Sequence, residues 1–69
     1  MKLYELPRDK NIPIYGLHDG EGKSITIIFG HLDGMYSYCW IKDDEESVVH
    51  LNASTPLEVY KDGYKVVEE

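Results

Sequence analysis

The sequence predicts an all-β domain, a small five- to six-stranded antiparallel barrel or rolled sheet. Asp-Gly, a strong hairpin-turn signal, occurs at positions 19–20, 33–34 and 62–63. The segments around these turns are rich in β-branched and aromatic residues, which favour strands. A chain of 69 residues has room for one domain, residues 1–69, with a thin core, because such chains bury only about 60% of their surface. An SH3-like barrel is the first expectation and an OB-like barrel the second.

The central hairpin is the clearest element. Residues 24–32 and 35–42 should be strands joined by a two-residue turn at Asp33-Gly34. The four consecutive acids of residues 43–46 should form the next turn, and residues 47–53 a third strand. This arrangement predicts which side chains share a face, because alternate residues of a strand point to opposite sides.

In that register His31 lies opposite Tyr36 and Phe29 opposite Tyr38. One face is almost entirely apolar and aromatic, and we expect it to line the interior: Ile25, Ile27, Phe29, His31, Tyr36, Tyr38 and Trp40. The other face is mixed, and Cys39 and His50 lie opposite each other on it. His31 and Tyr36 would sit at the mouth of the interior, where they either cap the core or border a small binding site.

The two ends of the chain are less regular. Residues 2–6 and 11–17 read as short strands, with Pro13 at an edge or near a strand start. Residues 55–58, Thr-Pro-Leu-Glu, fit the start of a short helical turn. Alternatively, residues 57–61 and 64–67 form a hairpin around Asp62-Gly63, which we favour because their valines and tyrosines prefer strands.

The composition indicates which kinds of partner to expect and in which cellular compartment the protein works. With 13 acidic side chains against 7 Lys and Arg, the formal net charge is −6, which argues against direct binding to nucleic acid. The chain has no apolar run long enough for a membrane helix, and its N-terminus lacks an apolar signal segment. We therefore expect a cytoplasmic protein with no membrane partner.

Gly22-Lys23-Ser24 resembles the end of a phosphate-binding loop. That motif requires a glycine where Leu17 stands, and its Lys-Ser should open a helix whose amides hold phosphate. Here Ser24 opens a strand. We therefore expect no nucleotide binding by this loop.

Metal and nucleophile candidates are also weak. A metal would need three or four converging ligands, and His18, His31, Cys39 and His50 lack ligand spacing. Cys39 beside His50 could in principle form a nucleophilic pair, but a free cysteine among apolar neighbours is more often a core residue. We expect no metal, no cofactor and no enzymatic activity.

The stretches "HLDGMYSYCW" (residues 31–40) and "VVHLNASTPLE" (residues 48–58) carry a family resemblance. Over residues 29–64 the chain resembles short, uncharacterised β-domain proteins encoded by bacteriophages and other mobile elements. The resemblance implies no activity and assigns no functional residue.

The aromatic residues suggest the function. Eight of them exceed what one thin core can enclose, so some tyrosines should be exposed, as at protein interfaces. We expect a non-enzymatic module that binds another protein through one patch of His31, Tyr36 and Tyr38, and a second of Tyr60 and Tyr64. The alternative is an acidic inhibitor that mimics nucleic acid through residues 43–46 and the terminal Glu68-Glu69. An open sheet edge would also allow a homodimer.

Overall fold

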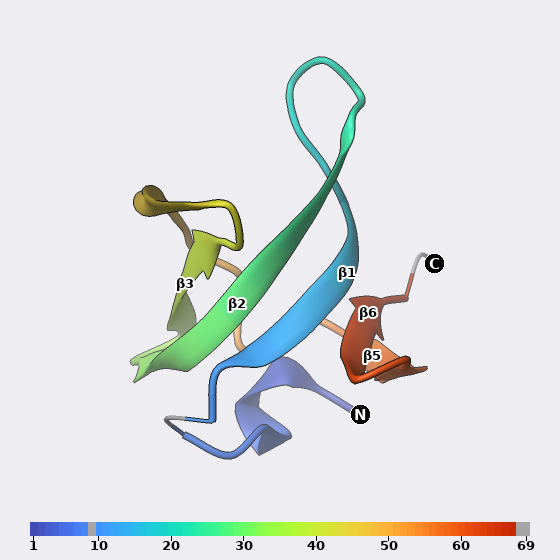
Figure 1. The fold of residues 1–69 in the computed structure, drawn as a ribbon. Coiled ribbons are helices and arrows are strands. Elements are labelled where there is room, and N and C mark those ends of the chain that lie inside the picture. Colours follow the sequence, from blue (N-terminus) through green and yellow to red (C-terminus); the bar gives the residue numbers. More distant parts are fainter. Residues whose placement is uncertain (9, 68–69) are drawn as a thin grey trace.

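A computed structural model describes residues 1–8 and 10–67, which form one six-stranded sheet preceded by a short 3-10 turn, η1 (Figure 1). The elements are η1 (Leu3–Glu5), β1 (Ile12–His18), β2 (Ser24–Asp33), β3 (Tyr36–Ile41), β4 (Asp44–Val49), β5 (Leu57–Tyr60) and β6 (Gly63–Val66). Their order across the sheet is β4-β3-β2-β1-β6-β5. The all-β expectation is confirmed.

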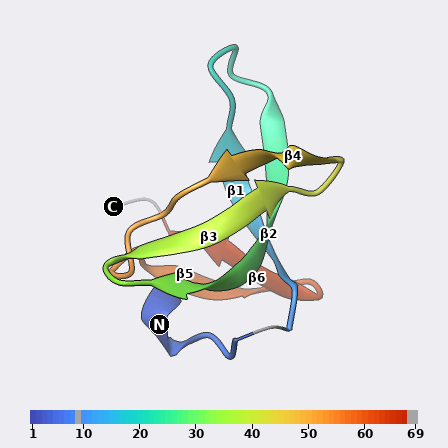
Figure 2. The same cartoon turned by 90° about the vertical axis from the view of Figure 1, so that its left-hand side faces the viewer.

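The sheet is mixed and open, so the expectation of a purely antiparallel barrel is wrong. β1 pairs with β6 in parallel, whereas the other neighbouring strands run antiparallel. The chain leaves β4 at one edge and crosses to the far side, where the β5–β6 hairpin adds to the free side of β1. Such a crossover brings β6 in parallel to β1. β4 and β5 remain as the two edges (Figure 2).

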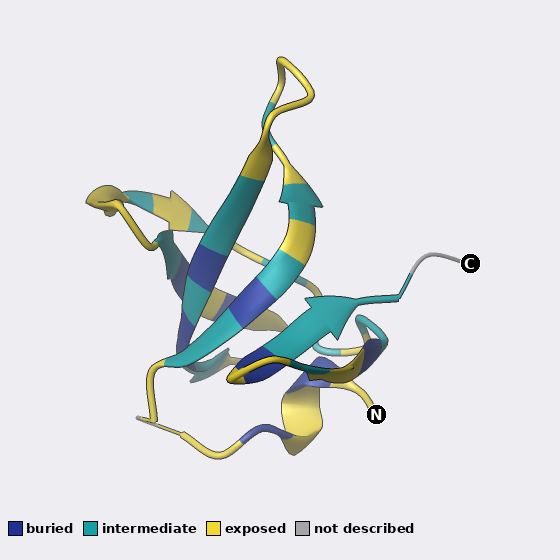
Figure 3. Ribbon diagram, turned by 45° about the vertical axis from the view of Figure 1, so that its right-hand side comes forward, coloured by how far each residue is buried: buried dark blue, intermediate teal, exposed yellow. Residues whose placement is uncertain are grey.

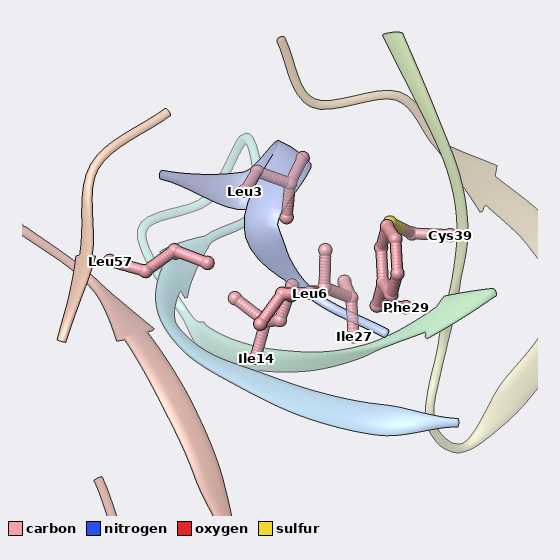
Figure 4. Close-up of a cluster of buried hydrophobic side chains, with 7 residues drawn as sticks. All are labelled: Leu3, Leu6, Ile14, Ile27, Phe29, Cys39 and Leu57. Atoms are coloured by element: carbon pink, nitrogen blue, oxygen red, sulfur yellow. The ribbon is translucent and has the colours of Figure 1, made fainter. Parts of the chain in front are cut away.

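The sheet curves around a core to which both ends of the chain contribute. The buried side chains come from η1 and the residue after it, and from β1, β2, β3 and β5 (Figures 3 and 4): Leu3, Leu6, Ile14, Ile27, Phe29, Cys39 and Leu57. The prediction of a strand over residues 2–6 is wrong. The segment instead forms the η1 turn, which places Leu3 and Leu6 in the core and is held by the bond from the Leu3 amide to the Thr55 carbonyl, 3.0 Å.

The C-terminal hairpin is confirmed, with its loop one residue earlier than predicted. Tyr60 pairs with Gly63, so Lys61 and Asp62 form the loop. Gly63 is required by packing, because a Cβ atom there would lie 2.1 Å from the Pro13 carbonyl oxygen. The absence of a side chain at this position lets β6 approach β1.

The central hairpin differs from the prediction at its turn and at Gly30. Asp33 pairs with Tyr36, so the loop residues are Gly34 and Met35. His31 then pairs with Tyr38, but the next pair is Phe29 with Cys39, so Gly30 forms a bulge.

The bulge decides which side chains enter the core. Ile27 and Phe29 point inward with Cys39, whereas His31, Tyr36, Tyr38 and Trp40 point outward. The expectation that the aromatic face lines the interior is therefore wrong for β3. His31, Tyr36 and Tyr38 do share a face, as predicted, but it is the outer one, because the unpaired residue shifts the alternation of β2 by one.

The β3–β4 connection is tighter than predicted. Ile41 pairs with Asp44, which leaves Lys42 and Asp43 as the loop, so β4 begins within the acidic run. Cys39 lies opposite Val49, and Trp40 opposite Val48. The predicted pairing of Cys39 with His50 is wrong, because the irregularity between Trp40 and Ile41 changes the register.

Candidate functional site

The outer side of the β2–β3 hairpin carries a group of rings, which we call the hairpin aromatic surface. They are His31 of β2, Tyr36, Tyr38 and Trp40 of β3, and His50, which follows β4. Three of them, Tyr36, Tyr38 and Trp40, lie at alternate positions of β3 and so project from the same side. Tyr36 is 56% exposed and Tyr38 40% exposed. Large aromatic side chains are left in contact with solvent along the whole strand.

Tyr38 is the centre of this surface. Its ring stacks on His31, with centroids 5.3 Å apart and an interplanar angle of 10°. It also meets Trp40 at 6.3 Å and the edge of His50 at 6.2 Å. The Trp40 ring covers Gly30, where a Cβ atom would lie 2.8 Å from it. The absence of a side chain at Gly30 therefore leaves the space that the end of the Trp40 ring occupies.

His50 is a member of this surface that the sequence prediction missed. Its Nδ1 lies 2.9 Å from the Ser37 carbonyl oxygen, which fixes the ring beside Tyr38. An open pocket of about 390 Å³ is lined by Asp33, Tyr36 and His50. The register of β4 was needed to place this histidine. Val48 pairs with Trp40 and so lies on the outer side, and His50, two residues further on, lies on the same side.

The predicted second patch does not form as one surface. Tyr64 is partly buried and packs against the core, opposite Val59. Tyr60, whose partner is Gly63, belongs to the outer face and contacts Tyr15 instead, with ring centroids 5.2 Å apart in an edge-to-face arrangement. Sequence reasoning could not pair Tyr15 with Tyr60, because the parallel β1–β6 contact brings them together.

Charged groups surround this second ring pair. The Tyr15 hydroxyl donates a 2.6 Å hydrogen bond to Asp62, which raises the pKa of Tyr15. The same bond, with nearby Lys42 and Lys61, holds the pKa of Asp62 below its usual value. The Lys61 ammonium lies 5.7 Å and 5.2 Å from the Tyr15 and Tyr60 ring centres. We call Tyr15, Tyr60, Lys61 and Lys65 the tyrosine–lysine surface.

Cys39 is not placed for nucleophilic chemistry. Its side chain is fully buried, and burial raises the pKa of the thiol, partly offset by the Ser37 hydroxyl 3.1 Å from Sγ. His50 is directed to the Ser37 carbonyl. Within residues 1–8 and 10–67, no three His, Cys, Asp or Glu side chains are arranged to hold a metal ion.

The acidic run lies at the β3–β4 hairpin, and its four side chains are all exposed. Asp44 has a structural role, since its carboxylate accepts a 2.6 Å bond from the Ser47 hydroxyl and a 3.3 Å bond from the Glu46 amide. The other three carboxylates face solvent. Glu68 and Glu69, which the acidic alternative also invoked, lie outside the described residues.

No protein-family model, curated protein or solved structure matches this chain significantly. Among the described residues, no helix has the length and apolar character needed to cross a membrane. What the protein does must therefore be inferred from its two ring-bearing surfaces and its acidic hairpin.

Proposed function

We propose that this protein is a non-enzymatic interaction module that binds another protein through the hairpin aromatic surface. The observation that carries the proposal is the set of rings that contact the partly exposed Tyr38: His31 stacked on it, Trp40 tilted and His50 edge-on. Exposed tyrosine and tryptophan are the side chains that most often provide binding energy at protein interfaces.

The arrangement of the rings supports a binding role over simple coverage of the sheet. The Tyr38 ring is held by its neighbours, and the His50 ring by the Ser37 carbonyl, so these side chains have little freedom left to lose on binding. Met35, 71% exposed, extends the apolar area at the turn. The pocket beside Tyr36 offers a place for one partner side chain.

A matched pair of tyrosine variants tests this proposal. A partner is first captured from cell lysate, identified and purified, and its affinity is then measured by calorimetry. Tyr36→Ala should weaken binding about 30-fold or more, the effect of truncating a tyrosine that provides much of the binding energy at an interface. Tyr4→Ala is the control, because Tyr4 is 57% exposed, almost the same as Tyr36, but lies on η1.

Equal losses in both variants would contradict the assignment, since they would indicate a general effect of removing tyrosine. No loss in Tyr36→Ala and Tyr38→Ala would exclude the hairpin aromatic surface as the binding site. Each variant should first give the near-ultraviolet circular dichroism of a folded protein.

The acidic alternative is favoured by one observation, the three solvent-facing carboxylates of Asp43, Glu45 and Glu46 on a projecting hairpin. A protein that displays them could occupy a basic, nucleic-acid-binding surface on a target. Such binding should fall steeply as salt rises, because the attraction between exposed charges is screened within about 10 Å at 0.1 M ionic strength. Glu45→Gln/Glu46→Gln would then weaken it while Tyr36→Ala would not.

We also propose a fold type, an origin and a cellular location for the protein. An SH3-like roll is our first choice of fold and an OB-like roll the second, supported by short strands in one curved sheet around a small core. The proposed origin is a phage or mobile element, from the sequence resemblance, and the proposed location is cytoplasmic, from the composition. An experimental structure compared with both fold types would test the first of these.

A further inference from the structure

The tyrosine–lysine surface borders a pocket that the hairpin aromatic surface does not share. The pocket is open and measures about 250 Å³. Its walls include the rings of Tyr15 and Tyr60, the Lys65 side chain, and Ser24 and Thr26 of β2. Polar donors and aromatic rings therefore meet in one concavity formed by β1, β2, β5 and β6.

Both rings are fixed before any ligand arrives. The bond to Asp62 holds Tyr15 by its hydroxyl, and Tyr15 in turn packs edge-to-face on Tyr60. Lys61 lies over both rings, and the Lys65 ammonium lies 5.3 Å from the Tyr60 centre. A ligand ring placed here would therefore cost little ordering of the protein side chains.

The charge around the pocket is unusual for an acidic chain. Lys23 and Lys42, together with Asp19 and Asp43, line an adjoining hollow that shares Ser24 and Thr26 with the pocket. Lys65 lines the pocket itself, and Lys61 lies over the Tyr15 and Tyr60 rings. Lys65 pairs with Glu58 at 3.2 Å, but Lys23, Lys42 and Lys61 form no ion pair with the described carboxylates.

Two of the nearby acids are engaged in hydrogen bonds, whereas Asp43, which lines the adjoining hollow, faces solvent. The Asp62 carboxylate accepts the Tyr15 hydroxyl, and Asp19 accepts the backbone amides of Glu21 and Lys23 at 2.9 Å each. No described carboxylate lines the pocket itself. An anion that enters would meet ammonium and hydroxyl groups first.

From this juxtaposition we infer that the pocket binds a planar ring that carries a single phosphate group, the size of one nucleotide. The ring would pack against Tyr15 and Tyr60, as bases do on aromatic side chains. The phosphate would accept hydrogen bonds from Lys61 or Lys65 and from the hydroxyls of Ser24 and Thr26. The site is distinct from a phosphate-binding loop, because its donors are side chains of separate strands.

A nuclear magnetic resonance titration of the intact protein with adenosine monophosphate tests the inference. Saturable shifts are expected at the amides of Gly16, Ile25 and Lys65, with a dissociation constant in the millimolar range or tighter. Adenosine and inorganic phosphate, which each carry half of the recognition, should bind about tenfold more weakly. Lys61→Gln should weaken binding about tenfold, as expected for loss of a charge-assisted hydrogen bond.

Two further variants distinguish the site from general effects. Tyr60→Leu should abolish the shifts, whereas Tyr36→Ala, on the other surface, should leave them unchanged. A short oligoadenylate distinguishes the source of the ligand: tighter binding than the monophosphate indicates a nucleic-acid strand, and equal or weaker binding indicates a free nucleotide. Either result supports the site.

Absence of saturable shifts at millimolar ligand would overturn the inference. Shifts that persist in folded Tyr60→Leu, or that fall outside the pocket, would overturn the placement. If Tyr60→Leu does not fold, Lys61→Gln serves in its place, because the Lys61 side chain is exposed and lies outside the core.

Discussion

The two ring-bearing surfaces are built by different forces. The hairpin aromatic surface is held by the backbone: a bulge at Gly30 directs His31 to the outer face, where the Tyr38 ring contacts the rings of His31, Trp40 and His50. The tyrosine–lysine surface is held by charge, through the bond between Tyr15 and Asp62 and the lysines over the rings. The first should therefore respond to changes in steric fit, and the second to changes in pH and salt.

The largest expected effect is at the base of the tyrosine–lysine surface. Gly63→Ala would force a Cβ atom against the Pro13 carbonyl, a backbone atom that cannot rotate away. We expect a loss of about 3 kcal/mol in the free energy of unfolding, at the upper end for overpacking. Urea unfolding measures it, with Gly20→Ala as the control, because Gly20 has no heavy atom within 4 Å of an added Cβ. Equal stabilities of the two variants would contradict this packing.

Gly30→Ala should have a smaller effect on stability but a specific one on the hairpin aromatic surface. The added Cβ would meet the tip of the Trp40 ring, which can move, as well as the Tyr38 carbonyl oxygen at 3.0 Å. We expect a loss of about 1–2 kcal/mol, together with a changed emission from Trp40, the one tryptophan of the chain. Unchanged fluorescence in a folded variant would show that Trp40 does not lie on Gly30.

The bond between Tyr15 and Asp62 in the tyrosine–lysine surface should make the free energy of unfolding depend on pH. The pKa of Tyr15 is raised in the folded state. The protonated hydroxyl therefore stabilises the fold at every pH below the ordinary tyrosine pKa, and this stabilisation is lost as the pH rises through the raised value. The pKa of Asp62 is lowered in the folded state. The ionised carboxylate therefore stabilises the fold at every pH above the ordinary aspartate pKa, and this stabilisation is lost as the pH falls through the lowered pKa.

Removing the acceptor tests this coupling. Asp62→Ala should return the pKa of Tyr15 toward its ordinary value, followed by the chemical shifts of the ring during titration. Asp44→Ala should leave the titration of Tyr15 unchanged, since the Asp44 carboxylate is bonded to Ser47. A raised pKa that survives in Asp62→Ala would mean that another group causes it.

The smallest effect on stability should come from Tyr36→Ala. The ring is more than half exposed and touches the surface from one side, so the free energy of unfolding should change by no more than about 0.5 kcal/mol. Chemical unfolding checks this value. A larger loss would show that Tyr36 supports the fold, and the binding test proposed for it would then need Tyr36→Phe.

These differences explain which parts of the molecule could be predicted from the sequence. The strand-rich segments and the Asp-Gly signals were enough to place the β2–β3 and β5–β6 turns to within one residue. The β3–β4 hairpin was placed less well, because β4 begins at Asp44 and not at Ser47. They were also enough to put His31, Tyr36 and Tyr38 on one face. The direction of that face depended on one unpaired residue, Gly30, and a single bulge reverses the alternation of a strand.

The second surface could not be predicted for another reason. Tyr15 and Tyr60 are brought together by the parallel pairing of β1 and β6, a contact between segments about 50 residues apart in the chain. Hydrophobic patterns report local structure, and they contain little information on which distant strand completes an edge. His50 was missed for a related reason, an irregular register between β3 and β4.

The same parallel pairing sets an order of events during synthesis. β1 to β4 can pair with their neighbours in turn as they leave the ribosome. The edge of β1 that faces away from β2 stays unpaired until β6 has been made. Leu3 and Leu6 cannot be fixed in the core early either, because the segment around Thr55, which holds η1 in place, is also made late. Since contacts between distant segments slow folding, the nascent chain should expose this half of its core until β6 has been made.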